Sequence, residues 1–302
     1  MREWRVAIFL VLGAFALVVG GYWWNEHRHV TLHDALNPKY WLRRWRSEDL
    51  YDPRTHMLYR GNRALREVAL TIDDGPHEGT GARLLDVLRA KHVRVTFFVI
   101  GENLNKYPEL SRRMVSEGHE VGNHSQSHLP LDRLTPRQVR NEIEDCDINF
   151  HRTTGGRLNL LRPPGMRYNG TVLRAASELG YIVVADTWGA RDYTEVTPDS
   201  IVRGVLRYAE NGSIILLHDE HPATAAALPQ IIETLRSRGY RFVTISEMLA
   251  HLPRPVIMTR RATGTRQSAR PRRAATLGGL VGVARIAQPL GCVIYSMKGG
   301  GA

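Results

Sequence analysis

Short β-rich runs alternate with longer helical patterns from Glu67 to His251, and this alternation limits the possible folds more than any other feature of the chain. Seven β/α units of this kind predict a parallel sheet with its helices outside, either open or closed into a barrel. The predicted strands cover 68–72, 93–100, 120–122, 158–161, 181–185, 213–218 and 241–244. The predicted helices cover 81–91, 108–117, 135–152, 170–179, 198–210, 223–238 and 245–251.

In folds of this class the chemistry gathers where the strands end, and polar residues stand at those ends here. The first strand runs into Asp73-Asp74-Gly75-Pro76, which also has the composition of an ordinary turn. The third is followed by His124 and His128, four residues apart, a spacing that would place both imidazoles on one face of a helical turn. One Asp and two His would leave coordination positions open for water and substrate, as a catalytic metal site requires.

Three more strands end in polar or aromatic groups: Arg162-Pro163-Pro164-Gly165, then Trp188 with Asp192-Tyr193, then Leu216-Leu217-His218. Each group alone has an ordinary structural explanation as a surface turn or a satisfied histidine. Five such groups, all at predicted strand ends, favour a catalytic site.

In order and spacing these groups resemble the five motifs of the polysaccharide deacetylases of the NodB-homology type, carbohydrate esterase family 4. The resemblance covers about Arg66 to Leu252. The chain has Ile72 where the family usually has Phe, Gly165 where it often has Tyr, and Tyr193 where Trp is more usual. The loss of the Tyr ring bears on sugar stacking and on the width of the groove.

The resemblance implies a distorted (β/α)7 barrel and a role for each matching residue. Asp74, His124 and His128 would bind a divalent metal, most commonly Zn²⁺, with Co²⁺, Ni²⁺ or Mn²⁺ as alternatives. Asp73 would be the general base held ionised by Arg162, and His218 the general acid oriented by Asp192. The Gly165 backbone N–H would bind the oxyanion, and Leu216 would contact the acetyl methyl. Trp188 or Tyr193 would form an aromatic wall of the groove, although either ring is equally well explained as part of the core.

The formal charge of +11 would favour a nucleic-acid or membrane partner if it lay on the fold. Residues 254–302 contain nine Lys and Arg and no Asp or Glu, so residues 1–253 carry only +2. We therefore expect no nucleic-acid partner, and we expect the tail from 253 to 302 to be a disordered, basic, low-complexity extension. The two cysteines, Cys146 and Cys292, cannot form a disulfide framework.

Val6 to Trp24 is a run of 19 residues without charge, preceded by Arg2 and Arg5 and about long enough to span a bilayer. Tyr22, Trp23 and Trp24 favour an uncleaved anchor over a cleaved signal peptide. The expected organisation is an anchor or signal over 1–29, a juxtamembrane segment over 30–65, a catalytic domain over 66–252 and the tail. The catalytic domain would lie outside the cytoplasm, periplasmic or at the cell surface, and would be secreted if the segment is cleaved.

Three functions remain open from the sequence. The first is metal-dependent removal of N-acetyl groups from amino sugars of a cell-envelope glycan, such as peptidoglycan, a chitin-like oligomer or an exopolysaccharide, by a monomer. The second is deacetylation or deformylation of a lipid-linked sugar at the membrane face, which the basic aromatic segment Lys39–Arg46 would suit. The third is a catalytically inactive glycan-binding module, which the intact chemical residues of all five motifs disfavour.

Overall fold

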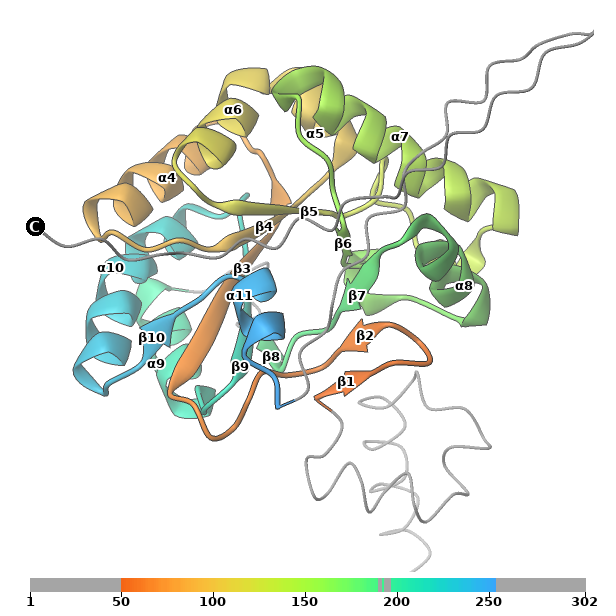
Figure 1. Ribbon diagram of the computed structural model, residues 1–302. Helices are drawn as coiled ribbons and strands as arrows, with labels where there is room; N and C mark the ends of the chain where they lie inside the picture. Colours follow the sequence, from red (N-terminus) through yellow and green to blue (C-terminus); the bar gives the residue numbers. More distant parts are fainter. Residues whose placement is uncertain (1–49, 190–191, 193–196, 254–302) are drawn as a thin grey trace, which may run out of the picture. The chain divides into compact units, whose positions relative to one another are not determined.

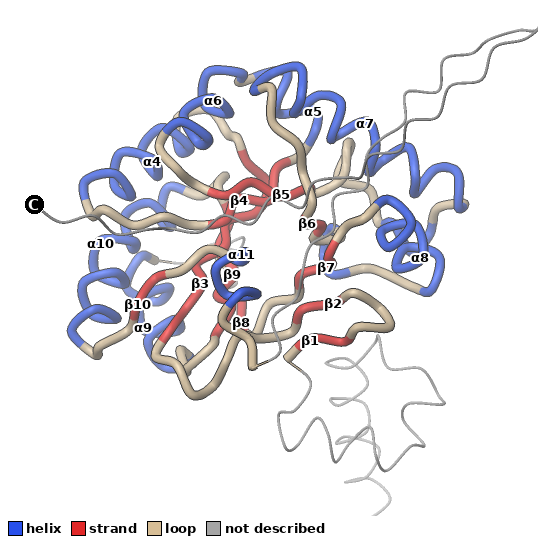
Figure 2. Tube along the Cα trace, viewed as in Figure 1, coloured by secondary structure: helices blue, strands red, loops and turns tan. Residues whose placement is uncertain are grey.

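A computed structural model describes residues 50–189, 192 and 197–253. Clustering of contacts divides the chain into residues 1–261 and 262–302, and the second unit lies wholly outside the described residues, as does the predicted tail. The predicted α/β alternation is confirmed, with a parallel barrel-like sheet surrounded by helices (Figures 1 and 2).

The sheet follows the order β1-β2-β7-β6-β5-β4-β3-β9-β8, and β10 pairs with the start of β3. All pairings are parallel except the one between β1 and β2. The strands are β1 (Tyr51–Asp52), β2 (Met57–Leu58), β3 (Glu67–Gly75), β4 (Thr96–Val99), β5 (Glu120–Asn123), β6 (Leu160–Leu161), β7 (Ile182–Val184), β8 (Trp188–Gly189), β9 (Ser213–His218) and β10 (Arg241–Phe242).

Most of the helices begin and end at residues whose side chains or backbone explain the boundary. Thr135 and Thr244 each form a capping box with the Gln or Glu three residues later, and α7 and α8 end at glycines in the left-handed conformation. The helices are α4 (Thr80–Ala90), α5 (Gly101–Lys106), α6 (Pro108–Ser116), α7 (Pro136–Thr154), α8 (Gly170–Leu179), α9 (Pro198–Tyr208), α10 (Pro222–Ser237) and α11 (Ile245–Ala250), with short 3₁₀ turns η1 (Leu131–Arg133) and η2 (Pro164–Met166).

Two hydrophobic cores follow from the two faces of the sheet. The larger lies between the strands and the outer helices and includes Cys146, which is fully buried. The smaller fills the inside of the barrel, where Ala69, Phe98 and Ile214 meet Met248 and Leu249 of α11. Helix α11 therefore closes one mouth of the barrel, the end at which the strands begin (Figure 1).

The inner face of the sheet changes character along the strands. In β3 the inward positions run from Ala69 through Thr71 to Asp73, and in β9 they run from Ile214 through Leu216 to His218. Because alternate residues of a strand share one face, the first half of each of these strands fills the barrel with apolar side chains. The second half presents polar side chains at the carboxyl ends, where the barrel is open. This end carries the candidate site.

The described domain begins before residue 66. Strands β1 and β2 lie within the 30–65 segment that the sequence assigned to a juxtamembrane region, and β2 adds to the sheet by pairing with β7. Within the part of the chain that the structure describes, no helix is both long and apolar enough to cross a bilayer. The apolar run Val6–Trp24 lies outside those residues.

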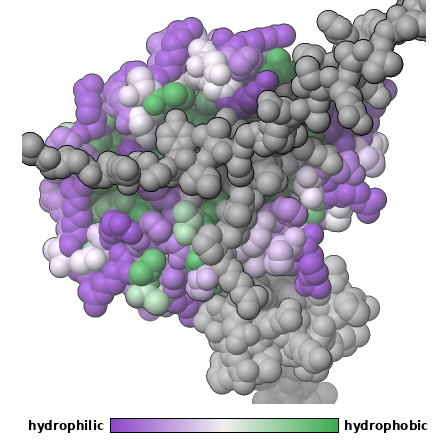
Figure 3. Space-filling view, viewed as in Figure 1, coloured by the Kyte–Doolittle hydropathy of each residue, from purple (hydrophilic) through white to green (hydrophobic). Residues whose placement is uncertain are grey.

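Most of the described surface in Figure 3 is hydrophilic, with small hydrophobic areas between polar ones. This distribution is typical of a domain whose apolar residues are used inside.

We expect Thr244→Ala to lower the free energy of unfolding by about 1 kcal/mol. The Thr244 hydroxyl accepts a hydrogen bond from Glu247 N at 3.3 Å, and the Glu247 carboxylate accepts one from Thr244 N at 2.9 Å, so the cap holds the helix that closes the barrel. Chemical denaturation measures the change. Thr171→Ala, at a threonine whose hydroxyl has no hydrogen bond among the described residues, is the control, and equal stability of the two variants would contradict the assigned role of the cap.

Candidate active site

A bulge in β3 brings two consecutive carboxylates into one site. Asp73 pairs with Phe98 and Gly75 with Val99, so Asp74 is an extra residue between two positions of the ladder. Its φ of 71° places it in the left-handed region. Side chains of consecutive strand residues normally point to opposite faces, and the bulge removes that restriction for Asp73 and Asp74.

Asp74, His124 and His128 offer three ligand atoms that lie within 4.8 Å of one another. The Asp74 Oδ1 atom is 3.1 Å from His128 Nε2 and 3.4 Å from His124 Nε2. The rings of the two histidines are 5.1 Å apart between centroids. Among the described residues this is the one group of three His, Cys, Asp or Glu side chains close enough to hold a metal ion together.

The chemistry of this donor set fits a cation. Nδ1 of His124 is 2.7 Å from the carbonyl oxygen of Arg162, which only a protonated Nδ1 can approach as a hydrogen-bond donor, so Nε2 keeps its lone pair for a ligand. Oδ1 of Asp74 is buried and has no hydrogen-bond partner among the described residues. Burial alone would raise the pKa of Asp74, but the two imidazoles beside it outweigh burial and hold that pKa well below its usual range.

The histidines reach this position from a loop. The sequence predicted one helical turn over 124–128, but these residues form an irregular segment in which Ser125 (φ 67°) and His128 (φ 55°) are left-handed. Side-chain bonds fix the segment: Asn123 Oδ1 accepts from Ser125 N at 2.8 Å, and Ser125 Oγ accepts from His128 N at 3.0 Å. Local side-chain bonds of this kind compete with helix formation and explain the difference.

Arg162 holds the second carboxylate. Its guanidinium donates to Asp73 Oδ1 at 2.8 Å and to the Thr71 hydroxyl at 2.7 Å, and it lies 4.3 Å from the centre of the Phe98 ring. The side chains of Arg162 and Asp73 are 1% and 4% exposed. A buried ion pair is favourable only when both partners are well hydrogen-bonded, so Asp73 is kept beside the metal ligands as a paired carboxylate. Its other oxygen is 3.6 Å from His124 Nε2.

His218 stands on the neighbouring strand with its own carboxylate. Asp192 Oδ1 is 2.7 Å from His218 Nδ1, and Asp192 Oδ2 accepts from His218 N at 2.8 Å and from the Thr224 hydroxyl at 2.7 Å. Burial would lower the pKa of His218, but the bond to Asp192 and its charge outweigh burial, and the pKa is raised above 6.5. His218 therefore binds its proton more tightly than an isolated imidazole does.

Two further carboxylates at this end were missed by the sequence analysis. Asp186 follows β7, and burial raises its pKa against the attraction of Arg162. Asp219 is fully buried, accepts from His77 N at 3.0 Å and thereby fixes the loop after Asp74; burial raises the pKa of Asp219 to about 7. A Cβ on Gly75 would stand 2.5 Å from its Oδ2, so a larger residue there would displace this carboxylate. Their positions after predicted strands were the sequence feature that could have identified both residues.

The remaining predicted substrate contacts are only partly placed. Gly165 is exposed in η2 with a φ of 57°, and Leu216 is half-buried on the inner face of β9, two residues before His218. The Trp188 backbone pairs with Ile215, but its side chain and all of Tyr193 lie outside what the structure describes. The predicted aromatic wall therefore stays a prediction.

Comparisons with known proteins agree on one family. Residues 60–184 match the family model described as polysaccharide deacetylase. A peptidoglycan-N-acetylglucosamine deacetylase of Bacillus cereus is 38% identical over 189 residues, covering 61% of this chain and 88% of the relative. The peptidoglycan-N-acetylglucosamine deacetylase PgdA of Listeria monocytogenes is 34% identical over 183 residues, but the match spans only 39% of its length and 61% of this chain.

A solved structure gives the same result. The crystal structure of the Bc1960 peptidoglycan N-acetylglucosamine deacetylase, in complex with a hydroxamate-type benzamide, superimposes with a TM-score of 0.63 at 33% identity. The superposition covers 64% of this chain and 92% of that one.

We expect Asp192→Asn to lower the pKa of His218, because the variant removes the charge that outweighs burial. Nuclear magnetic resonance titration of ¹⁵N-labelled histidine in the metal-free protein measures this value directly. Asp145→Asn, at an exposed position of α7, is the matched control and should leave the titration unchanged. An unchanged His218 pKa in Asp192→Asn would show that Asp192 does not hold the imidazole cationic.

Proposed function

The chain belongs to the polysaccharide deacetylase family, carbohydrate esterase family 4, and from that premise we propose that its site removes N-acetyl groups from the amino sugars of peptidoglycan. The chain is a metal-dependent carbohydrate N-deacetylase by family. One observation carries the proposal to this site: Asp74, His124 and His128 converge at the carboxyl ends of the strands, next to a separate carboxylate, Asp73, that Arg162 holds by a 2.8 Å contact.

The two carboxylates of the bulge have different partners and therefore different roles. Asp74 faces two imidazoles and is the ligand, while Asp73 faces a guanidinium and is the group that accepts a proton from the attacking water. The ion pair with Arg162 holds the Asp73 carboxylate in position beside Asp74 and His124, where the base would act. A divalent cation bound by Asp74, His124 and His128 supplies Lewis acidity to the amide carbonyl and lowers the pKa of the attacking water.

The leaving group needs a proton, and His218 is placed to give it. The raised pKa of His218 favours the protonated imidazolium, and the contact of Asp192 with Nδ1 orients the ring so that Nε2 would face the departing amine. The Gly165 N–H would donate to the carbonyl oxygen as that oxygen gains charge, and Leu216 would pack against the acetyl methyl. A backbone donor at Gly165 is independent of the Tyr side chain that the family often has there.

The finer assignments rest on chemistry and sequence. Two imidazoles and one carboxylate suit Zn²⁺, with Co²⁺, Ni²⁺ or Mn²⁺ as substitutes, so we propose Zn²⁺ as the resident ion. The names of the Bacillus and Listeria relatives favour peptidoglycan over a chitin-like oligomer or an exopolysaccharide. A lipid-linked sugar remains the alternative substrate.

We also propose that the uncharged run Val6–Trp24 anchors the chain in a membrane, with the catalytic domain outside the cytoplasm. Arg2 and Arg5 before the run and the aromatic residues at its end support this orientation. Membranes isolated from cells should retain the chain through carbonate washing and release it in detergent. Release by carbonate alone would contradict the anchor.

Acetate release by the full chain tests the activity. Peptidoglycan and hexa-N-acetylchitohexaose should each yield acetate in the presence of Zn²⁺, the yield should vanish after chelation, and His124→Ala should lower it by more than about 100-fold because a ligand is lost. His151→Ala, at an exposed histidine of α7, is the control.

Two results would overturn the proposal. A protein that binds no metal would contradict the mechanism. A protein that binds metal stoichiometrically and releases acetate from neither polymer would exclude peptidoglycan and move the assignment to the lipid-linked sugar.

A further inference from the structure

A group of basic residues lies at the end of the domain opposite the active site. We call it the basic face and define it by Arg63, Arg66, Arg207, Tyr208 and Arg238. Arg66 donates to the Arg238 carbonyl at 2.8 Å, Arg238 to the Leu206 carbonyl at 2.6 Å, and Asn211 to the Arg63 carbonyl at 3.0 Å. These contacts join the start of β3 to the ends of α9 and α10.

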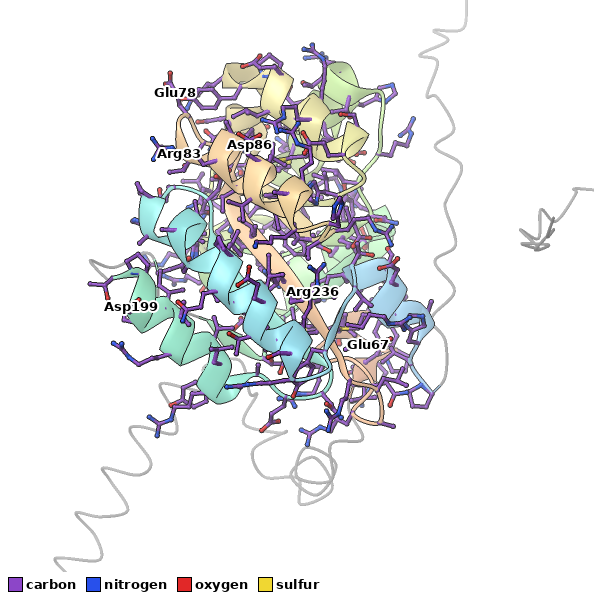
Figure 4. All side chains as sticks on the ribbon, turned by 90° about the vertical axis from the view of Figure 1, so that its left-hand side faces the viewer. Glu67, Glu78, Arg83, Asp86, Asp199 and Arg236 are labelled. Atoms are coloured by element: carbon purple, nitrogen blue, oxygen red, sulfur yellow. The ribbon has the colours of Figure 1, made fainter. Side chains whose placement is uncertain are left out.

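The two ends of the domain are separated along its strands and helices. Figure 4 shows Glu67, where β3 begins, at one end, and Glu78, in the loop after β3, and Asp199, in the first turn of α9, at the other. The basic face belongs to the end of Glu67, because Arg66 precedes Glu67 and Tyr208 is the last residue of α9, whereas Asp199 stands in its first turn.

The arginines of the basic face form no close ion pair with the carboxylates that the structure describes. All four arginines are exposed, and none has a carboxylate oxygen within 4.0 Å among the residues that the structure describes. The nearby carboxylates form their ion pairs with other arginines, Glu210 with Arg60 at 2.8 Å and Glu67 with Arg241, and Glu210 attracts Arg63 only from beyond ion-pair distance. Tyr208 is 48% exposed, and the Arg207 guanidinium lies 5.6 Å from the centre of its ring.

The domain as a whole carries no excess charge. Residues 50–253 contain equal numbers of basic (Lys and Arg) and acidic residues. Five carboxylates stand at the site end, namely Asp73, Asp74, Asp186, Asp192 and Asp219. The basic face is therefore a local group of cations on a domain without a net excess of Lys and Arg.

Both ends of the described chain leave the domain next to the basic face. The Leu50 carbonyl accepts from Tyr59 N at 3.0 Å, and Gly61 N donates to the Gly212 carbonyl at 2.8 Å, just before β9 begins. At the other end, His251 Nδ1 is 3.0 Å from the Glu67 carboxylate. The apolar run that ends at Trp24 is thus separated from this face by the sequence 25–49 alone, which includes the basic aromatic segment Lys39–Arg46.

We propose that the basic face lies on the headgroups of an anionic bilayer, so that the active site opens away from the membrane. A guanidinium group can form two hydrogen bonds to the oxygens of one phosphate, and tyrosine is enriched at the interface between water and lipid. A tether of 25 residues keeps the face at high effective concentration near the surface. The inference rests on the membrane anchor proposed above, and it does not depend on the deacetylase activity.

The test uses the full chain in lipid nanodiscs of phosphatidylcholine, with or without phosphatidylglycerol. Hydrogen exchange of peptides covering 61–68, 203–212 and 234–241 should slow several-fold in the anionic discs relative to the neutral ones. Peptides of α5 and α6, away from the face, should exchange equally in both. Because the readout is local, binding of the basic tail to the same discs does not produce the expected pattern.

Charge reversal identifies the residues responsible. The combined variant Arg63→Glu, Arg66→Glu, Arg207→Glu and Arg238→Glu should lose the slowing. Four exposed arginines elsewhere give the matched control, Arg83→Glu, Arg133→Glu, Arg137→Glu and Arg174→Glu, which should keep it. Circular dichroism and thermal unfolding report that each variant is folded, and acetate release from the soluble chitohexaose is measured separately.

Equal exchange in the two kinds of disc, or slowing that survives the charge reversal, would overturn the proposal. A chain that does not stay on the discs would remove the tether and overturn it as well. Slowing without acetate release would instead contradict the proposed function and leave the orientation standing.

Discussion

Arg162 is the residue on which both halves of the site depend. Its guanidinium forms an ion pair with Asp73, and its carbonyl oxygen accepts a hydrogen bond from Nδ1 of His124. Its side chain is almost completely buried against Phe98. Burying a guanidinium is costly unless its donors are used, and here Thr71, Asp73 and the carbonyls of Val184 and Ala185 receive them. One side chain thus fixes the proposed base, and its own backbone fixes a proposed metal ligand.

The division of labour between two adjacent carboxylates follows from the bulge in β3. In a regular strand Asp73 and Asp74 would point to opposite sides of the sheet, and only one would reach the site. The extra residue turns Asp74 toward His124 and His128 and leaves Asp73 on Arg162. The loop after it is then held by Asp219, whose carboxylate a residue larger than glycine at position 75 would displace. Along the same strand, Ala69 packs in the apolar interior of the barrel and Asp73 lies at its open, polar end.

The sequence was sufficient for seven of the ten described strands and seven of the eight described α-helices, because alternation of apolar strands with amphipathic helices is a local pattern. It placed the polar groups at the strand ends and the resemblance named the roles, but their geometry depends on contacts between distant segments. The Ser125 hydroxyl fixes the left-handed loop at His128. The pKa values of Asp186 and Asp219 are raised by burial that only the folded chain creates. The pairing of β2 with β7 joins residues that are over 120 positions apart in the sequence. A strand of two residues such as Met57–Leu58 is too short to show a periodic pattern of apolar residues in the sequence.

The separation of the two carboxylates is the central claim, and matched substitutions test it most directly. Asp73→Asn and Asp74→Asn make the same chemical change at neighbouring positions, and isothermal titration with Zn²⁺ and acetate release can be measured on both. The account predicts that Asp74→Asn loses metal binding and activity together, whereas Asp73→Asn keeps stoichiometric metal and loses activity. Equal loss of metal in both variants would show that the bulge does not divide their roles.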